Sequence, residues 1–366
     1  MRPGLAMLRR AGWRREHASF GRLDRRRNGV DVLEGAAAGE PKRSRSSGRR
    51  MRVAALDLGT NNCRLLIATS ARGGKLRIVD SFSRIVRLGE GVAHTGELSA
   101  PAIERTVAAL KICSEHIRAK GVQRVRAIAT EACRRASNAS VLIQRARAEA
   151  DIDLVIVSAE EEARLAAIGC APLIDGRASG GLIFDIGGGS TEVIWMRRNG
   201  QDDPKVVASV SEPVGVVTLA DMWNGRDGDG YEAMRHEMVE RFRPLRARMD
   251  RIELFNPHSH HLLGTSGTVT TLAGIALGLQ RYSRAQVDAS WHRCADIVAV
   301  IERLVKLDLN GRAAVGCVGP DRADLILPGC AIFEAIARLW PCTQLRVADR
   351  GLREGILREL IAETGA

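Results

Sequence analysis

Residues 181–196 read GLIFDIGGGSTEVIWM, and this stretch decides the fold. An apolar run of strand length carries Asp185 near its end, a turn of three glycines and two hydroxyl residues follows, and a second apolar run comes next. Residues 52–69, RVAALDLGTNNCRLLIAT, repeat this plan, with Asp57 at the matching place before a glycine-containing turn. The repeated plan indicates an internal duplication, which predicts two similar α/β domains that face each other.

The remaining pattern extends each hairpin into a mixed unit. A helix begins after Ser99, which caps it, carries Pro101 in its first turn and ends before Gly121. The other elements expected in the first unit are strands over 75–83, 125–129 and 154–157 and a helix after Ser137. A glycine-rich linker over 175–181 precedes the second unit, where helices are expected over about 230–250, 267–278, 291–307, 322–339 and 350–363. We therefore expect a tail over 1–50, a first domain over 51–175 and a second domain over 176–366.

The net charge of +12 is concentrated in residues 1–50, where 14 lysines and arginines stand against 5 acidic residues. This segment has no sustained apolar periodicity, so we expect a disordered basic tail. Met51 stands directly before the first strand, so translation from Met51 is one alternative, and an arm that binds nucleic acid is another. The rest of the chain is nearly neutral, and nucleic acid is not its expected partner.

Composition also bears on the compartment. No apolar run approaches the roughly 18 residues of a membrane span, and the tail lacks the apolar core of a secretory signal. The eight cysteines form no C-x-x-C pair and show no regular spacing. They are most simply reduced thiols, so we expect a cytoplasmic protein with no membrane partner.

The two turns have the composition of phosphate-binding loops. Glycine lets backbone N–H groups approach phosphate oxygens closely, and hydroxyl side chains add donors. An aspartate at the end of the preceding strand, here Asp57 or Asp185, binds Mg²⁺ directly or through water. One such turn is weak evidence, because glycine-rich hairpins are common. Two in one chain, each with its aspartate, could clamp a polyanion in the cleft between the domains.

A third glycine segment, LGTSGTVTTL over 263–272, runs from a strand into a helix. The amides near Gly264, Ser266 and Gly267 and the positive end of the helix suit a phosphate or a nucleotide. Turn and cap chemistry explains the same residues equally well. Arg134, which follows a strand, could pair with phosphate oxygens through two hydrogen bonds, and an exposed arginine at a helix end is the alternative.

Three consecutive glutamates begin a further helix in SAEEEARL, residues 158–165. They repel one another, but the positive end of the helix dipole stabilises them. Ser158 and Glu161 form a capping box, which explains Glu161 structurally. Glu162 has no such explanation. Beside a bound phosphate chain it could accept a proton from an attacking water and act as a general base.

These motifs, in this order, resemble the exopolyphosphatase and guanosine pentaphosphate phosphohydrolase family. The segments that carry the resemblance are DLGTN at 57–61, SAEEEARL at 158–165, DIGGGSTE at 185–192, GTSGTVTTL at 264–272 and DRGLRE at 349–354. The two turns alone are typical of the wider actin, sugar-kinase and heat-shock-chaperone superfamily, and the glutamate segment and DRGLRE narrow the resemblance. It implies two ribonuclease-H-like domains with an active site in the cleft between them, in the short, two-domain form of the family.

The resemblance also implies a reaction, the Mg²⁺- or Mn²⁺-dependent removal of a terminal phosphate by water. Glu162 matches the family's base and Arg134 its phosphate-binding arginine. Asp185 and Glu192 match its metal-binding pair, which Asp57 would join from the first turn. The residues that match its phosphate-binding turns are Gly59, Thr60, Asn61, Gly187, Gly188, Gly189, Ser190 and Thr191. Where family members more often have Ser-Phe, this chain has Asn-Cys at 62–63, which changes the shape beside the first turn without removing a donor.

The expected function is therefore an exopolyphosphatase that acts on inorganic polyphosphate. One alternative keeps the chemistry and takes guanosine pentaphosphate as substrate. A second is a sensor that binds polyphosphate or the alarmone without hydrolysing it. A third, a nucleotide-dependent clamp or phosphotransferase of the wider superfamily, gives no reason for the SAEEEARL segment. A homodimer is expected from the resemblance alone.

Overall fold

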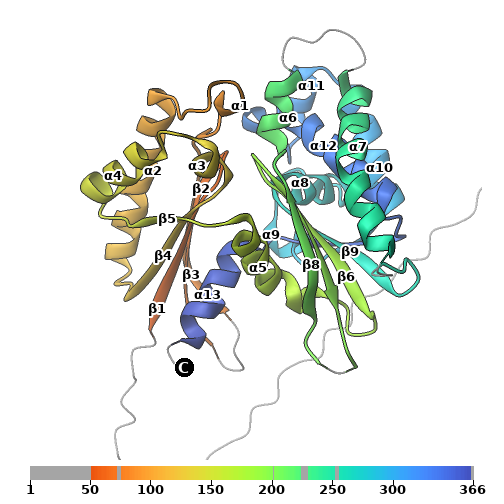
Figure 1. Cartoon of the computed structure of the whole chain (residues 1–366), viewed down its shortest axis with the longest axis horizontal. Coiled ribbons are helices and arrows are strands. Elements are labelled where there is room, and N and C mark those ends of the chain that lie inside the picture. Colours follow the sequence, from red (N-terminus) through yellow and green to blue (C-terminus); the bar gives the residue numbers. More distant parts are fainter. Residues whose placement is uncertain (1–50, 72–75, 201, 224–229, 252–254, 364–366) are drawn as a thin grey trace, which may run out of the picture. The chain divides into compact units, whose positions relative to one another are not determined.

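The computed structural model describes residues 51–71, 76–200, 202–223, 230–251 and 255–363. The basic tail expected over 1–50 lies outside them. The described residues form two mixed sheets with helices packed against them (Figure 1), which confirms the expected architecture. No helix in these ranges is long and apolar enough to cross a membrane.

The first sheet has five strands in the order β3-β2-β1-β4-β5. Strand β1 is antiparallel to β2 and parallel to β4, so the predicted hairpin is extended by a parallel crossover. Its strands are β1 (Arg52–Leu58), β2 (Asn62–Ser70), β3 (Leu76–Ile85), β4 (Arg124–Ala129) and β5 (Leu154–Ile156). The helices of this half are α1 (Val92–Thr95), α2 (Ala100–Ala119), α3 (Glu131–Arg135), α4 (Ala139–Ala150) and α5 (Ala159–Cys170), followed by the 3₁₀ turn η2 (Ala171–Leu173).

The second sheet has six strands in the order β10-β11-β9-β6-β7-β8. Its strands are β6 (Gly180–Ile186), β7 (Thr191–Arg197), β8 (Lys205–Glu212), β9 (His260–Thr265), β10 (Trp291–Arg293) and β11 (Gln344–Ala348). The helices of this half are α6 (Val216–Trp223), α7 (Gly230–Arg251), α8 (Gly267–Ala276), α9 (Arg284–Val287), α10 (Cys294–Val305), α11 (Leu309–Ala314), α12 (Ile326–Leu339) and α13 (Leu352–Ala362), with a 3₁₀ turn η3 (Pro320–Arg322).

The two sheets repeat one plan. The order β8-β7-β6-β9-β11 reproduces β3-β2-β1-β4-β5, and β10 adds one antiparallel strand at the edge. Even the irregularities recur, because the second strand of each hairpin shifts register between Ile67 and Ala68 in β2 and between Trp195 and Met196 in β7. Each shift lies the same distance along the chain from the aspartate of its hairpin, so the predicted duplication extends to local detail.

Several predicted elements need correction. The helix expected over 291–307 begins only at Cys294, because Trp291–Arg293 pairs with β11 as an edge strand. In this strand His292 is buried between two exposed neighbours, which is a strand's alternation and not a helix's. Strands β8 and β11 were also missed, since no element was expected over 205–212 or 344–348. Helix α2 behaves as predicted, since the Ser99 hydroxyl accepts a hydrogen bond from the Ala102 amide at 3.3 Å.

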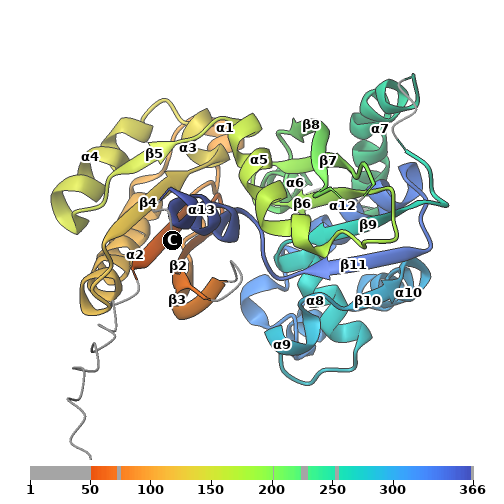
Figure 2. The ribbon, with the colours of Figure 1, turned by 90° about the horizontal axis from the view of Figure 1, so that it is seen from below.

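Helices α5 and α13 are exchanged between the two halves. Helix α5 contributes Ala163 and Ala166 to a core with Ile183 and Ile194 of the second sheet, although it follows the last strand of the first. Helix α13 comes last in the chain, yet its buried residues pack on Val53 and other residues of the first sheet. Both views draw the two helices together between the sheets (Figures 1 and 2). The division at residue 175 stays a prediction, and each sheet is covered in part by a helix from the other half.

Candidate active site

A cavity of about 570 Å³ lies between the two sheets and is lined by both predicted turns. Each turn is closed in the same way: the Gly59 amide donates to the Asn62 carbonyl at 2.9 Å, and the Gly187 amide donates to the Ser190 carbonyl at 2.9 Å. The duplicated sequence plan therefore folds into two turns with one hydrogen-bonding pattern, both at the same cavity.

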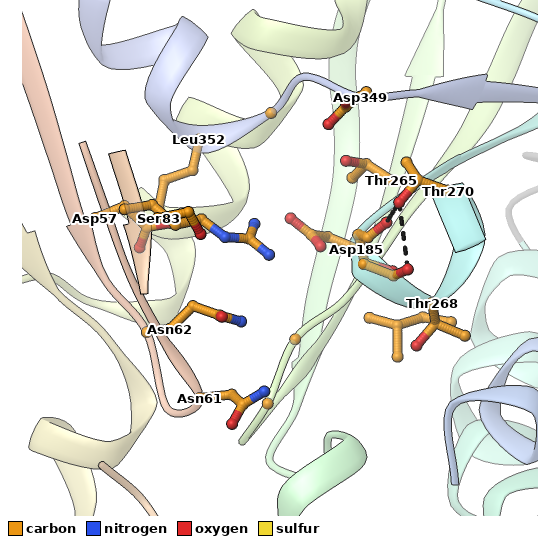
Figure 3. Close-up of a pocket in the computed structure, with 18 of the residues that line it drawn as sticks. Asp57, Asn61, Asn62, Ser83, Asp185, Thr265, Thr268, Thr270, Asp349 and Leu352 are labelled. Carbon is orange, nitrogen blue, oxygen red and sulfur yellow. Dashed lines mark hydrogen bonds between the residues drawn. The ribbon is translucent and has the colours of Figure 1, made fainter. Parts of the chain in front are cut away.

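The strand registers bring the carboxylates of the two hairpins to this cavity. Asp57 pairs across its hairpin with Arg64, and Asp185 pairs at the equivalent position with Glu192. Figure 3 shows Asp57 and Asp185 on opposite walls of the pocket. Both hairpins thus have the aspartate, but the residue opposite it is a cation, Arg64, in the first hairpin and an anion, Glu192, in the second.

Glycine in the second turn is required by contact with the first turn. A Cβ atom on Gly188 would lie 2.9 Å from the Thr60 Cβ, and one on Gly189 would lie 2.5 Å from the Thr60 hydroxyl oxygen. Those distances are shorter than real side-chain contacts, so the turns can meet only without side chains at these positions. Bare backbone is also what a phosphate group needs in order to reach amide donors.

The first turn carries polar atoms without partners. The Thr60 hydroxyl and the Asn61 side-chain oxygen are buried, and neither hydrogen-bonds to any of the residues that the structure describes. Buried polar groups normally have a partner, and an exception calls for an explanation such as a ligand. Both residues line the cavity, so the Thr60 hydroxyl is available to donate to a phosphate oxygen.

The three glutamates at the start of α5 have separate environments. The Ser158 hydroxyl accepts from the Glu161 amide at 3.2 Å, which is one half of the predicted capping box. Its other half, a hydrogen bond from the Ser158 amide to the Glu161 carboxylate, is not formed among the described residues, because that carboxylate pairs with arginines. The Glu161 carboxylate accepts from Arg126 at 2.6 Å and from Arg164 at 2.7 Å. Glu162, one residue further round the helix, lines the cavity. Helix geometry thus assigns Glu161 to the surface network and Glu162 to the site.

Arg134 holds the Glu162 side chain. Its guanidinium donates to the Glu162 carboxylate at 2.7 Å, to the Glu131 carboxylate at 2.9 Å and to the Val157 carbonyl at 3.0 Å. The short helix α3, which the sequence analysis missed, presents the arginine to these acceptors. Arg134 therefore orients Glu162 from behind the cavity wall. Its predicted contact with phosphate stays a prediction.

Four carboxylates in the cavity titrate abnormally. Burial raises the pKa of Asp185 to about 6, and burial together with the charge of Asp185 raises the pKa of Glu192 to about 7. Burial also raises the pKa of Asp57, and burial and the Glu192 charge raise that of Glu162 well above its ordinary value. The largest cause is the same throughout: each carboxylate is buried away from water, and neighbouring carboxylates raise the pKa further.

The third glycine segment contributes the start of α8. The Ser266 hydroxyl accepts from the Val269 amide at 3.4 Å, so the cap interpretation holds. The same helix end faces cations, because a Cβ atom on Gly267 would lie 3.5 Å from Arg322 Nη1 and 3.9 Å from Arg64 Nη2. In Figure 3, Thr268 and Thr270 of this segment lie on the wall opposite Asn61. The segment thus combines a cap with an electropositive corner of the cavity.

Most of the predicted site residues line one cavity. Those that do are Asp57, Gly59, Thr60, Asn61, Glu162, Asp185, Gly187, Gly188, Gly189, Ser190, Glu192, Ser266 and Gly267. Arg134, Thr191 and Gly264 are not among its lining residues. Thr191 is fully buried and donates its hydroxyl to the Val214 carbonyl at 2.7 Å, and Gly264 packs against the Phe184 ring in the sheet. Their predicted roles at a phosphate stay predictions.

The cavity also contains arginines that the sequence analysis missed. Arg64, Arg284, Arg322, Arg350 and Arg353 all line it. The sequence could have indicated Arg64, because Arg64 occupies in the first hairpin the position of Glu192 in the second. A signal existed for Arg350 and Arg353 in the DRGLRE segment. Arg284 and Arg322 have no comparable sequence signal, because only the tertiary fold brings them to the site.

Comparison with known proteins agrees with this geometry. Residues 66–363 match the Ppx/GppA phosphatase family. Exopolyphosphatase 2 of Mycobacterium tuberculosis is 32% identical over 324 residues, which cover 84% of this chain and 98% of the relative. A putative exopolyphosphatase of Haemophilus influenzae is 26% identical over 326 residues, covering 88% of this chain and 94% of the relative.

Solved structures agree as well. The crystal structure of the Aquifex aeolicus member of the Ppx/GppA family superposes with a TM-score of 0.70 at 29% identity, covering 86% of this chain and 99% of the other. An exopolyphosphatase from Cytophaga hutchinsonii has the same fold, with a TM-score of 0.77 at 24% identity over 86% of this chain and 98% of the other. The two turns, the glutamate segment and the two-sheet fold thus occur together over nearly the whole described chain, and this protein belongs to the Ppx/GppA phosphatase family.

Proposed function

We propose that this chain is an exopolyphosphatase, which uses water to release the terminal phosphate of inorganic polyphosphate. The observation that carries the proposal is the position of Glu162, a carboxylate held by Arg134 in the wall of a cavity between two phosphate-type turns. A proton acceptor beside preorganised donors is what hydrolysis of a phosphoanhydride requires. The relatives named exopolyphosphatase support the same substrate.

In the proposed reaction, water attacks the terminal phosphorus, the bond to the bridging oxygen breaks, and orthophosphate leaves the shortened chain. Glu162 accepts the proton that the attacking water loses. Its raised pKa makes its carboxylate a stronger base than an exposed glutamate. Amides and hydroxyls of the two turns bind the non-bridging oxygens as negative charge develops on them.

We also propose a Mg²⁺ or Mn²⁺ site at Asp57, Asp185 and Glu192. The carboxylates of both aspartates accept no hydrogen bond from the part of the chain that the structure describes, and their raised pKa values favour a cation nearby. In that part of the chain no three His, Cys, Asp or Glu side chains are grouped so as to hold a metal unaided. Mg²⁺ commonly combines one or two carboxylates with water and substrate phosphate, so one or two of these three carboxylates would hold the ion together with the phosphate chain. A bound cation would offset the charge of the phosphate oxygens.

The decisive experiment measures orthophosphate release by the full-length protein from polyphosphate and from guanosine pentaphosphate at matched concentrations. We expect release from polyphosphate with Mg²⁺ and none after chelation of the metal. Faster release from guanosine pentaphosphate than from polyphosphate would make guanosine pentaphosphate the preferred substrate. Tight binding of polyphosphate without release, in both Mg²⁺ and Mn²⁺, would support a sensor in place of an enzyme.

A homodimer and a cytoplasmic location are parts of the same proposal. Neither follows from the cavity, and both come from the sequence analysis. Light scattering of the purified protein tests the first, and fractionation of cells that express the protein tests the second.

A further inference from the structure

Arg353 is the second residue of α13 and lines the cavity. It belongs to the DRGLRE segment, whose backbone crosses from β11 of the second sheet to the helix that covers the first. Figure 3 draws the preceding residue, Leu352, on the same wall as Asp57 and Ser83. Arg353 thus joins the cavity lining from the last helix of the chain, and its charge acts on Asp57.

Two other arginines of this region, Arg284 and Arg350, are engaged by the protein. Arg284 donates to the Glu354 carboxylate at 2.8 Å and to the Asp349 carbonyl at 2.6 Å. Arg350 pairs with Asp288, through Nε to one carboxylate oxygen at 3.1 Å and through Nη2 to the other. Arg353 makes no hydrogen bond or ion pair with any residue in the described ranges.

A hydrogen bond supports the backbone beside Arg353. The Gly351 amide donates to the Glu354 carboxylate at 2.9 Å, which closes the first turn of α13. A Cβ atom on Gly351 would lie 3.5 Å from the Thr265 hydroxyl and 3.8 Å from an Asp185 carboxylate oxygen, so this turn lies beside Asp185 in the cavity lining. The first-turn amides of a helix lack partners within it, so they add positive potential at the same place.

The electrostatic environment favours an anion beside Arg353. Burial lowers its pKa, and so do the nearby positive charges of Arg64 and Arg284, whereas the charges of Glu354 and Asp57 act in the opposite direction. An arginine stays protonated under these conditions, so the cavity contains a desolvated cation whose charge no carboxylate contacts. A buried charge without a partner is costly, and a bidentate phosphate contact would remove that cost.

We propose that Arg353 is a substrate-binding residue, whose guanidinium binds two non-bridging oxygens of the phosphate chain beside Asp57. The inference rests on the proposed phosphohydrolase function and adds a contact that the phosphate turns do not supply. It also means that the phosphate held by the first hairpin is contacted by a helix from the second half of the chain.

The test measures equilibrium binding of tripolyphosphate with Mg²⁺ by calorimetry, in full-length protein carrying Glu162→Gln so that the probe is not consumed. Adding Arg353→Gln should weaken binding about 10- to 100-fold, the range for a lost hydrogen-bonded ion pair. Arg353→Lys should recover part of the loss, because lysine supplies the charge but not the planar pair of donors. Arg358→Gln is the matched control, since Arg358 lies on the same helix outside the cavity lining.

Binding by the Arg353→Gln protein within two-fold of its parent would overturn the proposal, and so would an equal loss in the Arg358→Gln control. A thermal melt of each variant shows whether it is folded. If the Arg353→Gln protein is not folded, binding by the Arg353→Lys protein tests the proposal. Phosphate release by the wild-type protein is measured separately. If the wild-type protein released no phosphate, the proposed hydrolysis would be wrong, but the binding measurement would still test the role of Arg353.

Discussion

Glu162 and Glu161 are adjacent residues of one helical turn with different surroundings. We expect Glu162→Gln to lower kcat by about 10²–10⁴-fold, the usual contribution of a positioned base, while substrate binding stays close to wild type. Glutamine keeps an oxygen that can accept the hydrogen bond from Arg134 and loses only the proton acceptor. Steady-state phosphate release with polyphosphate measures both quantities.

The matched control for that change is Glu161→Gln. It removes one charge from the same turn but weakens only the pairs with Arg126 and Arg164 at the surface. We expect near wild-type kcat and a lower unfolding temperature. Near wild-type phosphate release by Glu162→Gln, or an equal loss in both variants, would contradict the assignment of Glu162 as the base.

The raised pKa values of Asp185 and Glu192 predict how stability depends on pH. The folded protein holds protons on these carboxylates up to about pH 6 and 7, whereas the unfolded chain releases them at lower pH. Their contribution to stability is therefore complete in acid and is lost as pH rises through this range. We expect the unfolding temperature of metal-free protein to fall between about pH 4 and 7 in calorimetry, and Mg²⁺ to oppose the fall.

Glu192→Gln provides the control for this pH dependence. A glutamine cannot titrate, so the unfolding temperature of the metal-free variant should change less over the same range. A wild-type unfolding temperature that is independent of pH, or equal slopes in the two proteins, would show that these carboxylates are not the cause.

At the scale of the element, the two turns work as a pair in contact. Gly189→Ala places a Cβ atom 2.5 Å from the Thr60 hydroxyl and 3.0 Å from the Glu131 side chain, so one turn must move. Overpacking of this kind costs about 1–3 kcal/mol, and the displaced turn no longer presents its amides correctly. We expect a lower unfolding temperature and a loss of most phosphate release.

Gly176→Ala is the control, because a Cβ atom on Gly176 meets no atom within 4 Å. Its unfolding temperature and activity should match the wild type. Full activity in the Gly189→Ala protein would mean that the two turns need not touch during turnover.

At the scale of the whole molecule, residues 86–91 connect the first turn to the second half. The Gly89 amide donates to the Thr60 carbonyl at 2.9 Å, which supports the turn. From the same segment, Arg87 pairs with Asp324 at 2.9 Å, and the Gly91 amide donates to Asp221 at 3.2 Å. These contacts cross from the first half to the second beside the cavity, so they connect the first turn to the second half.

Asp324→Asn should therefore affect substrate binding more than stability. The pair with Arg87 is exposed, and such pairs contribute about 0–1 kcal/mol, so we expect at most about a five-fold rise in KM with little change in unfolding temperature. Asp321→Asn, a nearby exposed aspartate, is the control and should leave KM unchanged. A KM for Asp324→Asn equal to that of the control would show that the Arg87–Asp324 pair does not contribute to substrate binding.

The exchange of α5 and α13 explains where sequence reasoning stopped. The hairpins, their aspartates and their glycine turns were predicted because each is a local pattern of a few residues. Packing of α13 on the first sheet joins residues more than 200 positions apart, such as Arg126 and Glu359 at 2.7 Å. The packing of α13 also depends on its close contact with α5, because a Cβ atom on Gly355 would lie 2.0 Å from the Leu165 carbonyl oxygen of α5. No periodicity within α13 carries that information.

By itself, the sequence determined the duplicated hairpin plan, the identity of the turns and the difference between Glu162 and its neighbour Glu161. These depend on strand alternation, on glycine at turns and on the angle between successive helix residues, all of which are local. Only the tertiary structure decided that Arg134 holds Glu162, and that Arg353 reaches the site from the far end of the chain. The reason is physical: the partners and pKa values of charged groups depend on which distant segments bury them together.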